Sequence, residues 1–225
     1  MNNQLLNSRR IYALLLIPVV LSVLALFHFG FVFKSGSAGA GILILLLLYF
    51  KKNREAKDIW LLMAAFAFSI AGDWFLSHRH GDVNRFIAGI AFFFLAHIGY
   101  LAYALVNGKL NRKLTSLLLV AYLLFFFLKL YPSIKDVNLI GAAFVYLIIS
   151  CLSLGAAAGL RGNLAAKWSY IAGISLVLFS DTVIAFKEFV GYKELNFLIL
   201  PTYYMAHIFV VLSVMNRYLN GYKNE

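Results

Sequence analysis

Two aspartates lie where an acidic side chain is least expected. Asp73 and Asp181 are the only acidic residues well inside the long apolar segments of this 225-residue chain. An ionisable side chain near the centre of a membrane-spanning helix costs roughly 2.5–3.5 kcal/mol on insertion scales. The pair therefore favours a functional interpretation, whereas a single aspartate can also serve only to hydrogen-bond a neighbouring helix.

Other polar residues recur at matching depths around both aspartates. At 1.5 Å per residue, each aspartate lies about 20 Å from the start of its segment, and a histidine on the following segment lies about one turn deeper. Helical spacing is expected to group further polar side chains on the same faces. The candidate substrate-binding residues are Ser77, His97, Tyr100, Tyr203, Tyr204 and His207. For the histidines and tyrosines, structural hydrogen bonding or packing is the alternative role.

Two carboxylates in one low-dielectric pocket permit acid–base chemistry. One can hold a proton while the other stays ionised, which gives a general acid and a general base in a single site. Such a pair suits hydrolysis of an acid-labile bond and, equally, proton-coupled transport. The five histidines show no compact ligand spacing, so no metal is expected.

The composition predicts that these residues are held by membrane-spanning helices. Hydrophobic residues make up 63% and charged residues 13% of the chain, and its mean hydropathy is +0.85; soluble domains carry about 25% charged residues. A spanning helix needs about 20 apolar residues. The eight candidate spans are 11–33, 36–50, 59–77, 84–106, 114–131, 137–159, 168–187 and 195–216. We therefore expect an all-α fold, a polytopic bundle of eight transmembrane helices in a single membrane domain over residues 1–225.

The net charge of +11 comes from short basic clusters between the apolar segments. No cluster is long enough to form a groove for nucleic acid, so a nucleic-acid partner is not expected. More basic residues fall in the terminal tails and the even-numbered connections than in the others, which predicts that both termini are cytoplasmic. The apolar segment 11–33 exceeds the apolar core of a signal peptide, about 7–15 residues, and is interpreted as the first span and not as a cleaved leader.

A weak internal repeat relates the two halves of the chain. In each half a tryptophan, Trp60 or Trp168, precedes the aspartate by 13 residues, and a histidine follows the aspartate after 24 or 26 residues. The predicted repeats are 1–110 and 111–225. They would form parallel four-helix halves related by an axis along the membrane normal.

Three short motifs resemble those of a known family. Segments 71–76, 179–185 and 203–207 read AGDWFL, FSDTVIA and YYMAH. In their order and spacing they are similar to the motifs of the YhhN-like lysoplasmalogenase family, and the resemblance covers nearly the whole chain. His207 is a departure, because the family's last motif often has glutamine at this position.

The resemblance implies a multi-pass enzyme of the cell (inner) membrane that acts on a lysophospholipid surrounded by membrane lipid. Members hydrolyse the sn-1 vinyl ether bond of lysoplasmalogens to a fatty aldehyde and a glycerophospho-head group. Asp73 and Asp181 would then be the catalytic carboxylates, and neither a metal nor an organic cofactor would be required. The sequence leaves open which aspartate is the acid and what the oligomeric state is.

The alternative function is a small proton-coupled transporter or lipid carrier that uses the same aspartate pair. Against it, 225 residues is small for a transporter, and no pair of proline- or glycine-broken segments indicates a site at the membrane midplane. A purely structural membrane protein is a third interpretation, but it leaves two costly carboxylates unexplained.

Overall fold

The computed structural model describes residues 10–27, 30–52 and 55–220. Within these ranges the regular elements are helices, and one isolated β-bridge joins Gly108 to Leu160. A helix satisfies its backbone hydrogen bonds internally, which is what a chain of this hydropathy requires in a bilayer. The predicted all-α class is confirmed.

Six helical segments in the described ranges are long and apolar enough to cross a membrane, so the chain is an integral membrane protein. They correspond to the last six predicted spans. Their elements are α5 (Ile59–Ser77), α6 (Val83–Val106), α7 (Arg112–Phe125) with η1 (Phe126–Leu130) and η2 (Tyr131–Ser133), α8 (Val137–Ala158), α9 (Leu164–Ala185) with η3 (Phe186–Val190), and η4 (Asn196–Leu198) with α10 (Ile199–Asn220).

The first two predicted spans are shorter helices. α2 (Leu16–Leu26) belongs to an apolar helical segment that begins at Arg10, and it is followed by α3 (Phe31–Lys34) and α4 (Gly36–Lys51). The predicted single span 11–33 is not one helix, because the first helical segment ends at Leu26 and α3 begins after Gly30, whose φ of 98° lies outside the helical region and is readily adopted by glycine. The number of eight spans therefore remains a prediction.

Polar caps fix where several helices begin. A side-chain oxygen at each of these positions accepts a hydrogen bond from a backbone N–H of the first turn, which otherwise has no helical partner. The caps are Asp82 for α6, Asn111 for α7, Asp136 for α8 and Asn163 for α9. Each cap directly follows a short connection, so successive helices alternate in direction.

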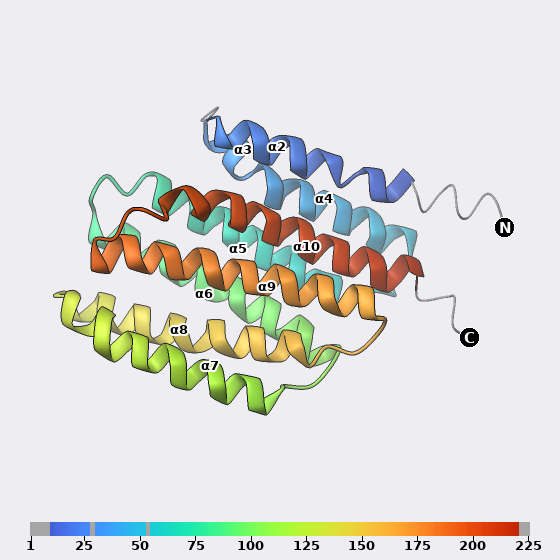
Figure 1. The fold of residues 1–225 in the computed structure, drawn as a ribbon. Coiled ribbons are helices and arrows are strands. Elements are labelled where there is room, and N and C mark those ends of the chain that lie inside the picture. Colours follow the sequence, from blue (N-terminus) through green and yellow to red (C-terminus); the bar gives the residue numbers. More distant parts are fainter. Residues whose placement is uncertain (1–9, 28–29, 53–54, 221–225) are drawn as a thin grey trace.

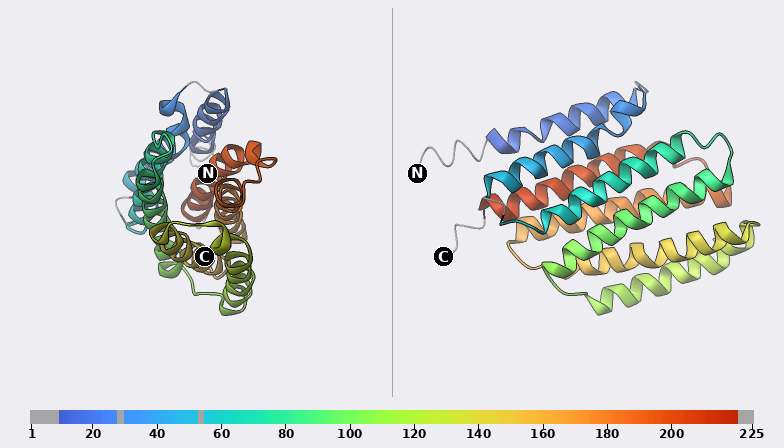
Figure 2. Two further views of the ribbon diagram at one scale, coloured as in Figure 1. Left: turned by 90° about the vertical axis from the view of Figure 1, so that its left-hand side faces the viewer. Right: turned by 180° about the vertical axis from the view of Figure 1, so that it is seen from behind.

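Six helices form a closed ring. Contacting neighbours follow the order α5, α6, α8, α9, α10, α4 and back to α5, while α2 packs outside α4 and α10 and α7 packs outside α8. Figure 1 shows the alternating helices side by side, and the end-on view in Figure 2 shows the hairpin α5–α6 facing α9 and α10. The proximal end is defined here by the connections 107–111 and 159–163, and the distal end by 78–82 and 191–195.

The ring order bears on the predicted repeat. If 1–110 corresponds to 111–225, then α4, α5 and α6 correspond to α8, α9 and α10, and each helix faces its counterpart across the ring. The order is compatible with the repeat, which remains a prediction.

α10 ends at the proximal end, where the first described helix begins (Figure 1). The cytoplasmic location of both termini concerns residues 1–9 and 221–225, which lie outside the described residues.

Glycines allow the tightest helix pairs to approach closely. A Cβ atom added to Gly99 of α6 would lie 2.7 Å from the carbonyl oxygen of Leu61 in α5. A Cβ atom added to Gly173 of α9 would lie 3.1 Å from the carbonyl oxygen of Ala206 in α10. Small residues at such contacts bring backbones together, and packing takes the place of a hydrophobic driving force within the bilayer.

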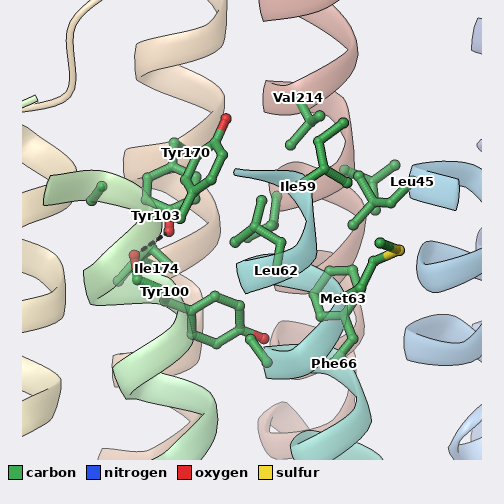
Figure 3. Close-up of a cluster of buried hydrophobic side chains, with 14 of the residues drawn as sticks. Leu45, Ile59, Leu62, Met63, Phe66, Tyr100, Tyr103, Tyr170, Ile174 and Val214 are labelled. Carbon is green, nitrogen blue, oxygen red and sulfur yellow. Dashed lines mark hydrogen bonds between the residues drawn. The ribbon is translucent and has the colours of Figure 1, made fainter. Parts of the chain in front are cut away.

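The hydrophobic core fills the proximal half of the ring. It includes Leu45, Leu62, Phe66, Tyr103 and Ile174, drawn in Figure 3. The hydroxyl of Tyr170 donates a 2.6 Å hydrogen bond to the backbone oxygen of Tyr100 within this core. Because these residues lie near the proximal ends of their helices, the distal half is left to hold the hollows described below.

Candidate functional site

Asp73 and Asp181 line the same hollow inside the ring. Each lies four residues before the end of its helix, Asp73 on α5 and Asp181 on α9, and these helices face each other across the ring. The hollow has a volume of about 60 Å³, and its lining includes Lys34, Phe93 and Tyr203. The two carboxylates predicted from sequence thus reach one cavity.

Asp73 is the more buried of the two aspartates, with 4% of the residue exposed. The hydroxyl of Tyr203 on α10 donates a hydrogen bond of 3.1 Å to its Oδ2. Gly72 lets α6 approach at this level, since a Cβ atom there would lie 2.8 Å from the ring of Phe93. Phe93 in turn packs edge-on against Tyr203, with ring centroids 5.9 Å apart, and holds the donor in place.

Two side chains contact the same carboxylate oxygen of Asp181. The hydroxyl of Tyr146 on α8 donates to Oδ2 at 2.7 Å, and Nε2 of His97 on α6 lies 3.3 Å from the same atom. A carboxylate only accepts hydrogen bonds, so His97 contributes when Nε2 carries the proton. The rings of His97 and Tyr146 meet edge-on at 5.3 Å. The side chain of Asp181 is 14% exposed.

Tyr146 was not among the residues predicted from sequence. It begins a polar stripe on α8 that continues with Ser150 and Ser153, one helical turn apart each time, in an otherwise apolar segment. That stripe is the sequence signal that could have identified it. Lys34, which follows the first predicted span, was not among the predicted residues either, although it lines the hollow with the aspartates.

The remaining predicted residues lie at different distances from the carboxylates. His207 is buried one helical turn after Tyr203 on α10, toward the proximal end, and its Nδ1 lies 3.0 Å from the hydroxyl of Ser37 on α4. Tyr100 is buried beside His97, with ring centroids 6.0 Å apart. Neither residue lines the hollow of the two aspartates, nor do Tyr204 and Ser77. Of the six predicted substrate-binding residues, Tyr203 and His97 are those hydrogen-bonded to an aspartate.

Two larger hollows adjoin this one and share residues with it. An apolar pocket of about 80 Å³ includes Asp181, Phe93, Leu76 and Ile184 in its lining. Its other lining residues come from α6, α7, η1, α8, α9 and η3. A polar vestibule of about 710 Å³ at the distal end shares Lys34, Leu76 and Ile184 with the aspartate hollow. The carboxylates therefore lie between an apolar compartment and a charged one.

The arrangement can hold and transfer protons but offers few ligands for a metal. Within residues 10–27, 30–52 and 55–220, no group of three or more His, Cys, Asp or Glu side chains lies close enough together to bind a metal ion. The two aspartates and their phenol and imidazole partners are suited to proton transfer to a bound molecule.

Fold and site together define a polytopic helical membrane protein with a carboxylate pair inside its helix ring. Compared with known families, residues 33–214 match the YhhN family, and the chain belongs to that family. The matched range contains every helix from α4 to α9, and most of α10. Neither a curated protein sequence nor a solved structure matched the chain.

Proposed function

We propose that this protein is a membrane lysoplasmalogenase. It would hydrolyse the sn-1 vinyl ether bond of a lysoplasmalogen to a fatty aldehyde and a glycerophospho-head group. The single observation that carries the proposal is that Asp73 and Asp181, from facing helices, line one hollow inside the membrane bundle. Membership of the YhhN family is consistent with this function.

The chemistry requires one proton donor and one proton acceptor. A proton added to the β-carbon of a vinyl ether leaves an oxocarbenium ion at the α-carbon. Water adds to this cation and gives up a proton, and the resulting hemiacetal breaks down to an aldehyde and the free glycerol hydroxyl. A protonated aspartate would supply the first proton, and an ionised aspartate would stabilise the cation and accept the proton of the water.

The hydrogen bonds favour Asp73 as the acid and Asp181 as the base. Asp181 faces two groups able to donate, Tyr146 and His97, and donors stabilise the ionised form of a carboxylate. Asp73 accepts one longer bond, from Tyr203, and is the more buried residue, which favours its neutral form. Asp73 loses its proton to the substrate and Asp181 gains one from the attacking water, so the total number of protons on the two aspartates does not change.

The apolar pocket next to Asp181 would hold the alkenyl chain. Its lining is almost entirely hydrophobic and comes from the distal halves of the surrounding helices. A chain held there would place the first carbons of the vinyl ether at the carboxylates, because the pocket and the aspartate hollow share Asp181 and Phe93. The wall facing the vestibule includes Leu76, Phe86 and Ile184.

The membrane arrangement is part of the proposal. We infer eight membrane-crossing helices with both termini in the cytoplasm, two parallel repeats and residence in the cell membrane. The supporting observations are the excess of basic residues in the even-numbered connections and the alternating helices of the closed ring. In this orientation the distal end, with its vestibule, faces outward.

The deciding experiment measures aldehyde release from lysoplasmenylethanolamine by the purified protein, comparing the wild type with Asp73→Asn and Asp181→Asn. Both variants are expected to lose activity, since asparagine keeps the shape but neither donates nor accepts the transferred proton. Asp136→Asn is the matched control, because Asp136 only caps α8 and asparagine caps equally well.

Activity that survives both substitutions would exclude the proposed acid and base. If the wild type releases no aldehyde but reconstituted protein takes up lysolipid in response to a proton gradient, the same aspartates serve a proton-coupled carrier instead. The two outcomes separate the enzyme from the alternative that the sequence left open.

A further inference from the structure

The vestibule at the distal end carries an excess of positive charge. Four basic and two acidic side chains line it, which leaves a net charge of +2. The basic residues are Lys34, Arg79, Lys187 and Lys193, and the acidic ones are Glu188 and Glu194. They come from four separate parts of the chain, so the fold gathers the charges at this opening.

Neighbouring groups orient two of these cations. The guanidinium of Arg79 forms an ion pair of 2.8 Å with Glu188 and lies 5.0 Å above the centre of the Phe86 ring. Nζ of Lys34 donates a 2.7 Å hydrogen bond to the hydroxyl of Ser77. A guanidinium held in this way keeps further N–H groups for an incoming oxyanion.

Lys34 lies between the vestibule and the two aspartates. It lines both the vestibule and the hollow that contains Asp73 and Asp181. An anionic group bound by Lys34 would therefore sit at the mouth of the carboxylate hollow. An anion there is attracted strongly, since charges at the edge of a low-dielectric bundle are screened less than charges in water.

We propose that Lys34, Arg79 and Lys193 form a binding site for the phosphate of a single-chain lipid's head group. The inference rests on the proposed function and adds the residues that select its substrate. In such a lipid only the glycerol backbone separates the phosphate from the sn-1 oxygen. Lys34 on the phosphate would hold the sn-1 bond at the aspartates, with the chain in the apolar pocket. Arginine and lysine are the side chains that recognise phosphate.

The test compares two vinyl ether substrates that differ in the phosphate. One is lysoplasmenylethanolamine and the other is the matching 1-alkenylglycerol, which carries no charge. For the variant Lys34→Met/Lys193→Met, the ratio of kcat/KM for the phosphate-bearing to the neutral substrate is expected to fall about tenfold or more, as expected for lost bonds to a charged group. Lys34→Arg/Lys193→Arg should restore most of the ratio.

The matched control is Lys135→Met, which removes the same charge from the connection before α8 at the distal end, outside the vestibule lining. It should leave the ratio unchanged. An unaltered ratio in the double Met variant, or an equal fall in the control, would overturn the proposed phosphate site.

A binding arm separates this inference from the proposed function. It measures binding of a non-cleavable 1-O-alkyl lysophosphatidylethanolamine to the full-length protein in detergent. Loss of binding in the double Met variant supports the phosphate site even if the wild type releases no aldehyde, whereas aldehyde release with unchanged binding overturns this site alone. If inorganic phosphate competes as well as the lysolipid, the vestibule is a site for the free ion, and the head-group assignment is wrong.

Discussion

Replacing Tyr146 with phenylalanine tests the assignment of Asp181 as the ionised partner. The substitution removes only the hydroxyl that donates 2.7 Å to Asp181 Oδ2 and keeps the ring beside His97. The apolar pocket that Tyr146 also lines keeps its shape. Asp181 is then left with His97 as its hydrogen-bond partner, at 3.3 Å.

The expected loss follows from the strength of the bond. A hydrogen bond to a charged group contributes about 1.5–3 kcal/mol. If that bond stabilises the ionised Asp181 needed in the transition state, its removal should lower kcat roughly 10- to 150-fold, since each 1.36 kcal/mol is a factor of ten. KM should change little, because the hydroxyl contacts Asp181 and the alkenyl chain of the proposed substrate loses no apolar contact.

Aldehyde release by Tyr146→Phe and by Tyr122→Phe gives the comparison. Tyr122 lines the same apolar pocket, but its hydroxyl pairs with Thr182 Oγ1 at 2.8 Å and is bonded to neither aspartate. The control should keep wild-type kcat. The assignment is refuted if Tyr146→Phe keeps full kcat, or if both variants lose activity to the same extent and the loss reflects pocket polarity alone.

Two further predictions concern packing and chain selection. Gly99→Ala should lower the thermal stability of the purified protein by about 1–3 kcal/mol, because the new methyl group would clash with the carbonyl oxygen of Leu61. The control Gly141→Ala should be neutral or stabilising, because nothing lies within 4 Å of a Cβ atom there. Equal melting temperatures for the two variants would contradict the close packing at Gly99. Ala143→Phe should fill the apolar pocket and shift the kcat/KM preference toward substrates with shorter alkenyl chains. The control Val145→Phe, on the exposed face of the same helix, should leave that preference unchanged. If Ala143→Phe also leaves it unchanged, this pocket is excluded as the binding site for the chain.

Helices α5, α6 and α8 were predicted to within one residue at each end, whereas α9, which carries Asp181, begins at Leu164, four residues before its predicted start at 168. The predicted span 84–106 and the observed helix Val83–Val106 differ by one residue, since Asp82 caps the helix start. The segment 11–33 had no such signal inside it. The first helical segment ends at Leu26, and Gly30 before α3 gave no warning of the break, because glycine also occurs inside regular helices, as at Gly39 in α4.

The site was predicted less completely than the fold. The high cost of a membrane-embedded carboxylate predicts Asp73 and Asp181 as the site, and the two side chains do line one hollow. Which tyrosines and histidines reach them depends on the rotation of each helix about its axis, and sequence spacing does not fix that rotation between helices. Tyr146 was therefore missed, while His207, at the matching depth, contacts Ser37 and not an aspartate.

The two carboxylates differ because equivalent positions carry different side chains. In the predicted repeat, Tyr203 corresponds to Phe93, so the tyrosine that donates to Asp73 has no counterpart beside Asp181. Asp181 is contacted instead by His97 and by Tyr146. In the proposed mechanism, the unequal donors determine which aspartate carries the proton, with Asp73 neutral and Asp181 ionised.

The donors also explain why the site needs both halves of the chain. Asp73 belongs to the first half and accepts from Tyr203 of the second, while Asp181 belongs to the second half and is contacted by His97 of the first. A shift of one half against the other would therefore disturb both aspartates at once. The tightly packed proximal core resists such a shift, and this rigidity is what permits a hollow, polar site in the distal half of a small membrane protein.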